Sequence, residues 1–169
     1  FISMHRYGGL PAPLAAAAVA LLAAALSLYL AAAMAWVAKR RSGRPLADAT
    51  RFAAGWLAAE LARGVLFTGF PWVASGYGQV DGPLAVLAPF IGVYGIGAVL
   101  AWAGALLGLA AAAALAPGRG LPPARSPGMS PGMSPRAAVG LAVAVLAGPA
   151  AWGLAGGPPD FTRPGRNLQ

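Results

Sequence analysis

Long apolar runs alternate with short basic segments along this chain. Charged side chains are absent from four stretches, at residues 7–38, 64–80, 82–118 and 137–159. A helix needs about 20 mostly apolar residues to cross the hydrocarbon core of a bilayer. The first, third and fourth stretches meet that length, whereas glycine and proline interrupt the second. The pattern therefore predicts membrane-spanning helices and one irregular segment.

The helix limits follow from the residues that flank each run. Pro11 or Pro13 favours the start of a first helix, and Lys39 can reach lipid headgroups where that helix ends. Pro89 and Gly92 are expected to divide the third stretch, which is longer than one span requires. We expect an all-α integral membrane protein, a bundle of about four transmembrane helices with one irregular aromatic and glycine-rich loop. The expected spans are about 11–38, 46–66, 91–116 and 136–154, and the expected loop is 67–90.

The expected helix at 46–66 differs from the others because it carries acidic and basic side chains. Trp56, Glu60 and Arg63 follow one another at helical spacing, so they share one face, and Glu60 and Arg63 could form an ion pair. Charged groups at membrane depth are costly, so this face should point into the bundle or a polar cavity. A structural ion pair and a face that acts on a substrate both remain open at this point.

The segment at 66–79, LFTGFPWVASGYGQ, combines aromatic residues with helix breakers. Irregular backbone at membrane depth requires protein or water around it, so this segment should line a cavity. Phe70, Trp72 and Tyr77, together with Pro71 and Gln79, are candidates to contact an acyl chain or a lipid headgroup. The alternative is an aromatic belt, since tryptophan and tyrosine gather at membrane interfaces for their amphipathic shape alone.

Composition and charge support a membrane location. Hydrophobic residues make up 59% of the chain and charged residues 9%, whereas soluble domains carry roughly a quarter charged residues. The net charge of +8 arises mainly from loops at 39–51 and 119–136. Basic residues placed between apolar runs favour anionic lipid over nucleic acid as the partner. Such loops are usually cytoplasmic, which would put the 67–90 loop and Gln169 outside.

No group of residues in the sequence predicts catalysis. The chain has no cysteine, and its one lysine, Lys39, lies in a basic loop. His5 is the one histidine, which does not make a metal site, and we expect it to be a loop or interface residue. We therefore expect no catalytic residue, no metal and no cofactor within this chain.

The remaining segments and the chain ends carry less information. A low-complexity connector is expected at 117–135 and an extended periplasmic tail at 155–169. The chain starts at Phe1 without an initiator methionine or a basic segment before the first apolar run. We expect no signal peptide and regard the chain as part of a longer protein.

Several motifs resemble a known family. They are, in the family's order, ISMHRYGGLPAP at 2–13, Glu60-x-x-Arg63-Gly64, LFTGFPW at 66–72, Gly76-Tyr77-x-Gln79 and PLAVLAPFIGVYG at 83–95. Together they resemble the membrane domain of bacterial apolipoprotein N-acyltransferase. Gly78 departs from the pattern, because the family usually has serine there.

The resemblance implies an enzyme of the bacterial inner membrane. It would transfer a fatty acyl group from a phospholipid to the N-terminal diacylglyceryl-cysteine of an apolipoprotein. In the family, a nitrilase-like periplasmic domain performs this reaction with a Glu-Lys-Cys triad through a thioester. The earliest family spans would precede Phe1 and that domain would follow Gln169, so the chain alone is not expected to turn over. Its expected role is to anchor the domain, admit lipid and hold the acyl donor.

Two alternatives remain, one from a related arrangement and one from another class of protein. In the related actinobacterial arrangement, a similar membrane and nitrilase-like region is associated with a polyprenol-phosphate mannosyltransferase and serves as its anchor. A small transporter or channel subunit could instead use Glu60 and Arg63 in a polar pathway. A complete catalytic triad beyond Gln169 would favour the acyltransferase, and solute movement in liposomes would favour the transporter.

Overall fold

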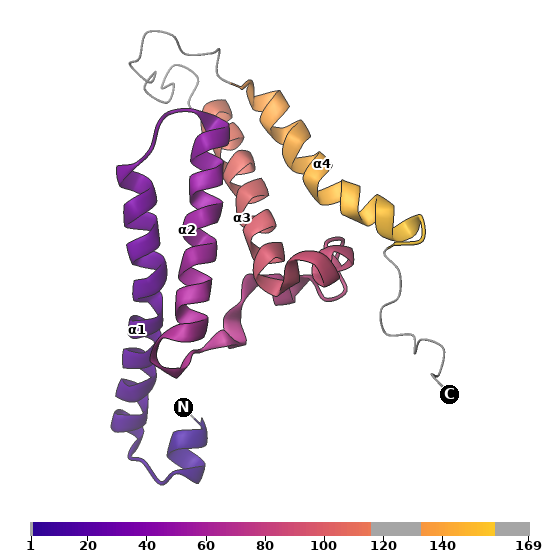
Figure 1. Cartoon of the computed structure of the whole chain (residues 1–169). Coiled ribbons are helices and arrows are strands. Elements are labelled where there is room, and N and C mark those ends of the chain that lie inside the picture. The colour runs from indigo at the N-terminus through magenta and orange to yellow at the C-terminus, as the bar shows by residue number, and fades with distance from the viewer. Residues whose placement is uncertain (1, 116–132, 158–169) are drawn as a thin grey trace, which may run out of the picture.

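A computed structural model describes residues 2–115 and 133–157 (Figure 1). All regular secondary structure in these two ranges is helical, which confirms the predicted all-α class. The long helices are α1 (Ala12–Lys39), α2 (Pro45–Val65), α3 (Ala88–Leu115) and α4 (Pro135–Leu154). Short turns of π- or 3-10 helix are η1 (Ser3–Tyr7), η2 (Leu66–Thr68), η3 (Pro71–Val73), η4 (Ser75–Gln79) and η5 (Ala85–Leu87). Most of the expected connector and almost all of the tail lie outside the described residues.

Three helices of the described chain are long and apolar enough to cross a membrane. They are α1, the continuous helical segment Ala85–Leu115 that η5 and α3 form together, and α4. Most side chains along these helices are exposed, as expected where lipid rather than water surrounds the protein. Helix α2 is not among them, because its charged residues lower its hydropathy. Its predicted passage through the membrane therefore stays a prediction.

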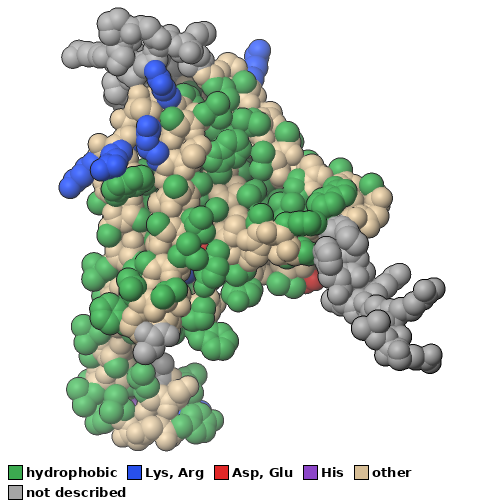
Figure 2. Space-filling view, in the orientation of Figure 1, with side chains coloured by type: hydrophobic (Ala, Val, Ile, Leu, Met, Phe, Trp, Pro, Cys, Tyr) green, Lys and Arg blue, Asp and Glu red, His purple; other side chains and the backbone are tan. Residues whose placement is uncertain are grey.

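Successive helices pack side by side and run in alternate directions (Figure 1). α1 contacts α2, α2 contacts α3, and α3 contacts α4. The helix ends that meet near the α1–α2 turn carry most of the visible lysine and arginine side chains (Figure 2). Small residues allow close approach: a Cβ atom on Gly55 would lie 2.8 Å from Cγ2 of Val37 in α1. The core shared by α2, α3 and α4 is likewise built mostly from alanine, at Ala49, Ala103, Leu106, Ala110, Ala138 and Ala142.

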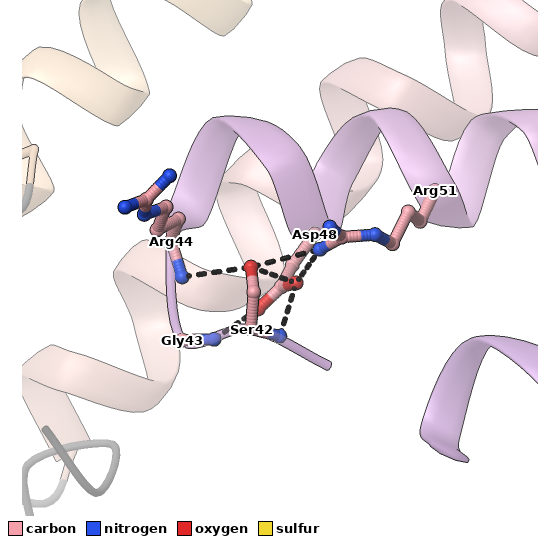
Figure 3. A network of polar contacts seen from close by, with 5 residues as sticks. All are labelled: Ser42, Gly43, Arg44, Asp48 and Arg51. Atoms are coloured by element: carbon pink, nitrogen blue, oxygen red, sulfur yellow. Dashed lines mark hydrogen bonds and ion pairs between the residues drawn. The ribbon is translucent and has the colours of Figure 1, made fainter. Parts of the chain in front are cut away.

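A buried carboxylate organises the turn between α1 and α2 (Figure 3). Oδ1 of Asp48 accepts hydrogen bonds from the backbone N–H of Ser42 (2.8 Å) and from its hydroxyl (2.9 Å). Oδ2 accepts the N–H of Gly43 at 2.8 Å, and the guanidinium of Arg51 lies 2.8 Å from Oδ1. Asp48 thus provides hydrogen-bond acceptors for the backbone N–H groups of Ser42 and Gly43, which lie between the two helices.

The start of α3 lies earlier than expected. The irregular loop was predicted to extend to residue 90, but α3 begins at Ala88 and contains a break at Gly92, where φ is 63° and ψ is −177°. Pro89 is compatible with helix here, because a first-turn residue needs no backbone N–H. The conformation at Gly92 is accessible to glycine and strained for other residues. Gly92 therefore separates one short turn from the long helix.

Candidate functional site

The segment between α2 and α3 turns back sharply where α2 ends. Phe67 adopts a left-handed conformation, with φ 51° and ψ 51°, and its side chain is exposed. Gly69 also has positive φ, at 79°. After this reversal, the N–H of Phe70 donates to the carbonyl of Arg63 at 2.7 Å. The following turn, η3, therefore lies back against α2, and η4 packs against α3.

Three side chains from one face of α2 hold this segment. Nε1 of Trp56 donates to the hydroxyl of Ser75 at 3.1 Å. Oε1 of Glu60 accepts the backbone N–H of Ser75 at 2.7 Å, and a guanidinium nitrogen of Arg63 donates to the carbonyl of Val73 at 2.8 Å. The helical spacing of Trp56, Glu60 and Arg63 predicted a shared face, and the structure shows that this face meets the loop and α3.

Glu60 and Arg63 bind the loop more closely than they bind each other. Their closest nitrogen–oxygen distance is 3.9 Å, a long ion pair, whereas each makes a hydrogen bond of 2.8 Å or less to loop backbone. Glu60 is 4% exposed. Its Oε2 atom and Nε of Arg63 are buried and accept or donate no hydrogen bond within the described residues. The loop backbone is thus the main partner of both charges.

Glycine residues let the loop, α2 and α3 meet without intervening side chains. A Cβ atom on Gly97 of α3 would lie 2.5 Å from the Ser75 hydroxyl and 2.8 Å from Oε2 of Glu60. A Cβ atom on Gly76 would overlap the backbone carbonyl of Val93. At Gly76 a side chain would require the backbone of α3 to move, whereas at Gly97 it would require the Ser75 and Glu60 side chains to shift. Sequence reasoning did not single out Ser75 or Gly97, because neither position has a local pattern that predicts its partner.

The predicted site residues do not form one cluster. Trp72 is 81% exposed and Pro71 beside it is exposed, whereas Phe70 is half-buried. Tyr77 and Gln79 line a separate pocket of about 230 Å³ together with residues at the start of α3. His5 belongs to η1, where its Nδ1 atom lies 2.8 Å from the carbonyl oxygen of Leu10. The candidate lipid contacts therefore face different surroundings.

An open apolar groove of about 640 Å³ lies between α1 and the end of α2. Helix α1 contributes the side of the groove from Leu22 to Ala32, and the reversal after α2 contributes residues that include Phe67 and Phe70. Arg63 is the charged residue in its lining. The α1 side was not predicted from sequence, because its leucine and alanine residues look the same as those that simply face lipid.

The comparison with known proteins covers all of the site residues described above. The model of the family "Apolipoprotein N-acyltransferase N-terminal domain" matches residues 1–106. The chain belongs to this family. The match confirms the resemblance that the motifs indicated, and it includes the groove, the loop and the face of α2 that holds the loop.

Individual members of the apolipoprotein N-acyltransferase family are similar over the same part of the chain. The apolipoprotein N-acyltransferase of Verminephrobacter eiseniae is 62% identical over 101 residues, which are 60% of this chain and 19% of that protein. The one from Ralstonia nicotianae is 51% identical over 118 residues, 68% of this chain and 22% of that protein. The chain thus spans about a fifth of the length of these relatives.

Proposed function

We propose that this chain forms the acyl-donor part of the membrane domain of a phospholipid:apolipoprotein N-acyltransferase in the bacterial inner membrane. The complete enzyme would transfer a fatty acyl group from a phospholipid to the N-terminal diacylglyceryl-cysteine of an apolipoprotein. Family membership and the names of the relatives support this reaction class. The chain contains no cysteine, so a thioester intermediate would form on a residue outside it.

The groove beside α1 is the observation that carries the proposal. Its lining is apolar except for Arg63 and the phenol of Tyr29, and its volume of about 640 Å³ lies within the range of small-molecule sites. A phospholipid has matching chemistry, since it joins apolar acyl chains to a negatively charged phosphate. An acyl chain along α1 would leave the polar end of the lipid near Arg63 and the loop. The proposed occupant of the groove is therefore the acyl donor.

The loop aromatic residues support the same assignment. Phe70 lines the groove, and Trp72 is two residues away with its side chain almost fully exposed. An exposed tryptophan two residues after a groove-lining residue can contact the glycerol and ester region of a lipid through its ring and its N–H. In this proposal Phe70 and Trp72 contact the donor, whereas Tyr77 and Gln79 line the neighbouring pocket.

Filling the groove tests the proposal. In the full-length protein that contains this chain, Ala25→Trp places a large ring among the groove residues of α1. We expect the KM for the phospholipid to rise about tenfold, equivalent to about 1.4 kcal/mol of lost binding. The measurement is N-acylation of a diacylated lipoprotein at varied phospholipid concentration, normalised to inserted protein.

A neighbouring substitution provides the control. Ala24→Trp adds the same ring one residue earlier on α1, at an exposed position outside the groove lining. Its KM should stay close to that of the unmodified protein. If Ala25→Trp has the same KM for the phospholipid as Ala24→Trp, the groove does not hold the donor. The anchor and transporter alternatives remain hypotheses, and solute exchange by the purified chain in liposomes would revive the second.

A further inference from the structure

Helix α2 carries two buried carboxylates, and each one binds the backbone of the loop next to it. Asp48, near the start of the helix, accepts N–H groups of the preceding turn, including that of Ser42. Glu60, three turns later, accepts the N–H of Ser75 in the following loop. The two carboxylates therefore have the same kind of contact at opposite ends of α2, but only Glu60 lies beside the proposed donor site.

Side chains of α2 add hydrogen bonds to the backbone of the loop at 71–79. The backbone hydrogen bonds at the ends of its short turns, from the N–H groups of Ala74, Tyr77 and Val80 to the carbonyls of Pro71, Ala74 and Tyr77, measure 3.1–3.3 Å. The bonds that Glu60 and Arg63 make to the loop are shorter, at 2.7 and 2.8 Å, and they involve charged groups. Charge-assisted hydrogen bonds are roughly twice as strong as neutral ones, and low local polarity strengthens them further. The position of this loop thus depends on these two side chains of α2 as well as on its packing against α3.

Both attachment points closely follow the exposed tryptophan along the chain. Arg63 binds the carbonyl of Val73, the residue that follows Trp72, and Glu60 binds the N–H of Ser75 two residues later. On the side of α3, the backbone of Gly97 lies close to the Glu60 carboxylate and the Ser75 hydroxyl. A shift of Glu60 would therefore move the segment that presents Trp72.

We infer that Glu60 is a positioning residue. It fixes the loop at 71–79 so that Trp72 keeps its position relative to the groove. This inference rests on the proposed function of that site. Glu60 itself does not touch the donor, because its carboxylate is buried between Ser75 and Gly97. Its effect on the reaction passes through the loop backbone.

Hydrogen exchange on this chain in lipid nanodiscs tests the structural half of the inference without any need for activity. Glu60→Leu removes the acceptor for the Ser75 N–H, and exchange in the peptide covering 71–79 should accelerate about tenfold or more. Glu60→Gln keeps an oxygen that can accept this N–H, so exchange should stay within about threefold of the unmodified chain. Unchanged exchange in Glu60→Leu would overturn the inference.

A second pair of variants avoids any loss of the buried charge. Gly97→Ala adds a methyl group that presses on Oε2 of Glu60 and on the Ser75 hydroxyl, while alanine favours the helix. Gly104→Ala adds the same group to α3 at a position with no atom within 4 Å. We expect faster exchange at 71–79 in Gly97→Ala and unchanged exchange in Gly104→Ala. Equal behaviour of the two variants would contradict the role of Glu60.

Kinetics of the full-length protein test the functional half. Loss of positioning should raise the KM for the phospholipid severalfold in Glu60→Leu, with recovery in Glu60→Gln, because the donor is bound less well. A purely structural defect would lower the amount of active enzyme and leave KM unchanged. Faster exchange with an unchanged KM would overturn the positioning role. Failure of Ala25→Trp to raise KM would instead refute the donor groove and leave the exchange results standing.

Discussion

At the residue scale, neighbouring side chains of the loop at 66–79 have opposite environments. Trp72 is 81% exposed, whereas Ala74 and Gly76 are buried against the rest of the protein. Gly76 has no space for a side chain, because Val93 of α3 lies directly against it. Gly78 has no atom within 4 Å of an added Cβ, so a serine would also fit there. The loop thus combines fixed backbone with aromatic groups that are free to meet a ligand.

Trp72 should matter for activity more than tryptophans that lie in the helices. In the full-length protein, Trp72→Ala is expected to lower N-acylation about tenfold or more, because the exposed ring contributes to substrate contact and little to packing. Trp36→Ala and Trp102→Ala are the comparisons. Trp36 lies under the Arg40 guanidinium at 5.1 Å, and Trp102 donates to Thr50 at 3.2 Å.

The readout for these three variants is N-acylation of a diacylated lipoprotein per inserted protein. Trp36→Ala and Trp102→Ala should reduce the amount of inserted protein more than its specific activity, since both rings have structural partners. Equal specific activities for all three variants would leave Trp72 as a membrane-interface anchor, as the aromatic-belt alternative predicts.

At the element scale, α2 and α3 each depend on one feature that a regular helix lacks. Helix α2 accepts charged residues because both of its buried carboxylates bind backbone N–H groups of adjacent loops. Helix α3 begins with a short turn that ends at Gly92, and the long helix starts after this break. The break allows the chain to enter α3 from η5 while Val93 still contacts Gly76. Both features place the loop between the two helices.

Gly92→Ala should destabilise the protein although it adds only a methyl group. An L-residue with φ 63° and ψ −177° is strained, at a cost of about 1–3 kcal/mol. Gly108→Ala is the matched control, since this glycine lies inside α3 with no atom within 4 Å of the added Cβ. It should stabilise the helix by about 0.5–1 kcal/mol. Unfolding in detergent, followed by circular dichroism, would compare them. A stabilised Gly92→Ala variant would mean that the break at Gly92 is not required.

At the scale of the whole molecule, the helix directions gather most of the visible lysine and arginine residues of the described chain at one end (Figure 2). The turn between α1 and α2 lies at that end, and the loop at 66–79 lies towards the other (Figures 1 and 2). Lysine and arginine bias determines orientation in bacterial membranes, so the basic end should be cytoplasmic. Gln169 and Arg125 lie outside the described residues, and the predicted outer position of the C-terminus stays a prediction.

Single cysteines can test this orientation, because the chain has none of its own. Asp81→Cys lies beyond the loop and Arg41→Cys lies at the basic end, and both positions are exposed. A membrane-impermeant maleimide added to intact spheroplasts should label Asp81→Cys and should reach Arg41→Cys only after the cells are lysed. The opposite labelling pattern would reverse the topology.

The sequence by itself determined which parts of the chain are helical and which family it belongs to. Apolar run length, proline and glycine positions and basic flanks are local signals, and they predicted the helices and the break at Gly92. Helical spacing placed Trp56, Glu60 and Arg63 on one face. These signals need no knowledge of what lies opposite each residue.

Only the tertiary structure decided which surfaces meet. It paired Glu60 with the Ser75 backbone, placed Gly97 over both, and joined α1 to Phe70 around one groove. Hydrophobic pattern cannot predict these pairings, since an apolar side chain that faces lipid and one that faces protein have the same composition. Close approach of small residues selects the partners, and that geometry appears only when the helices pack.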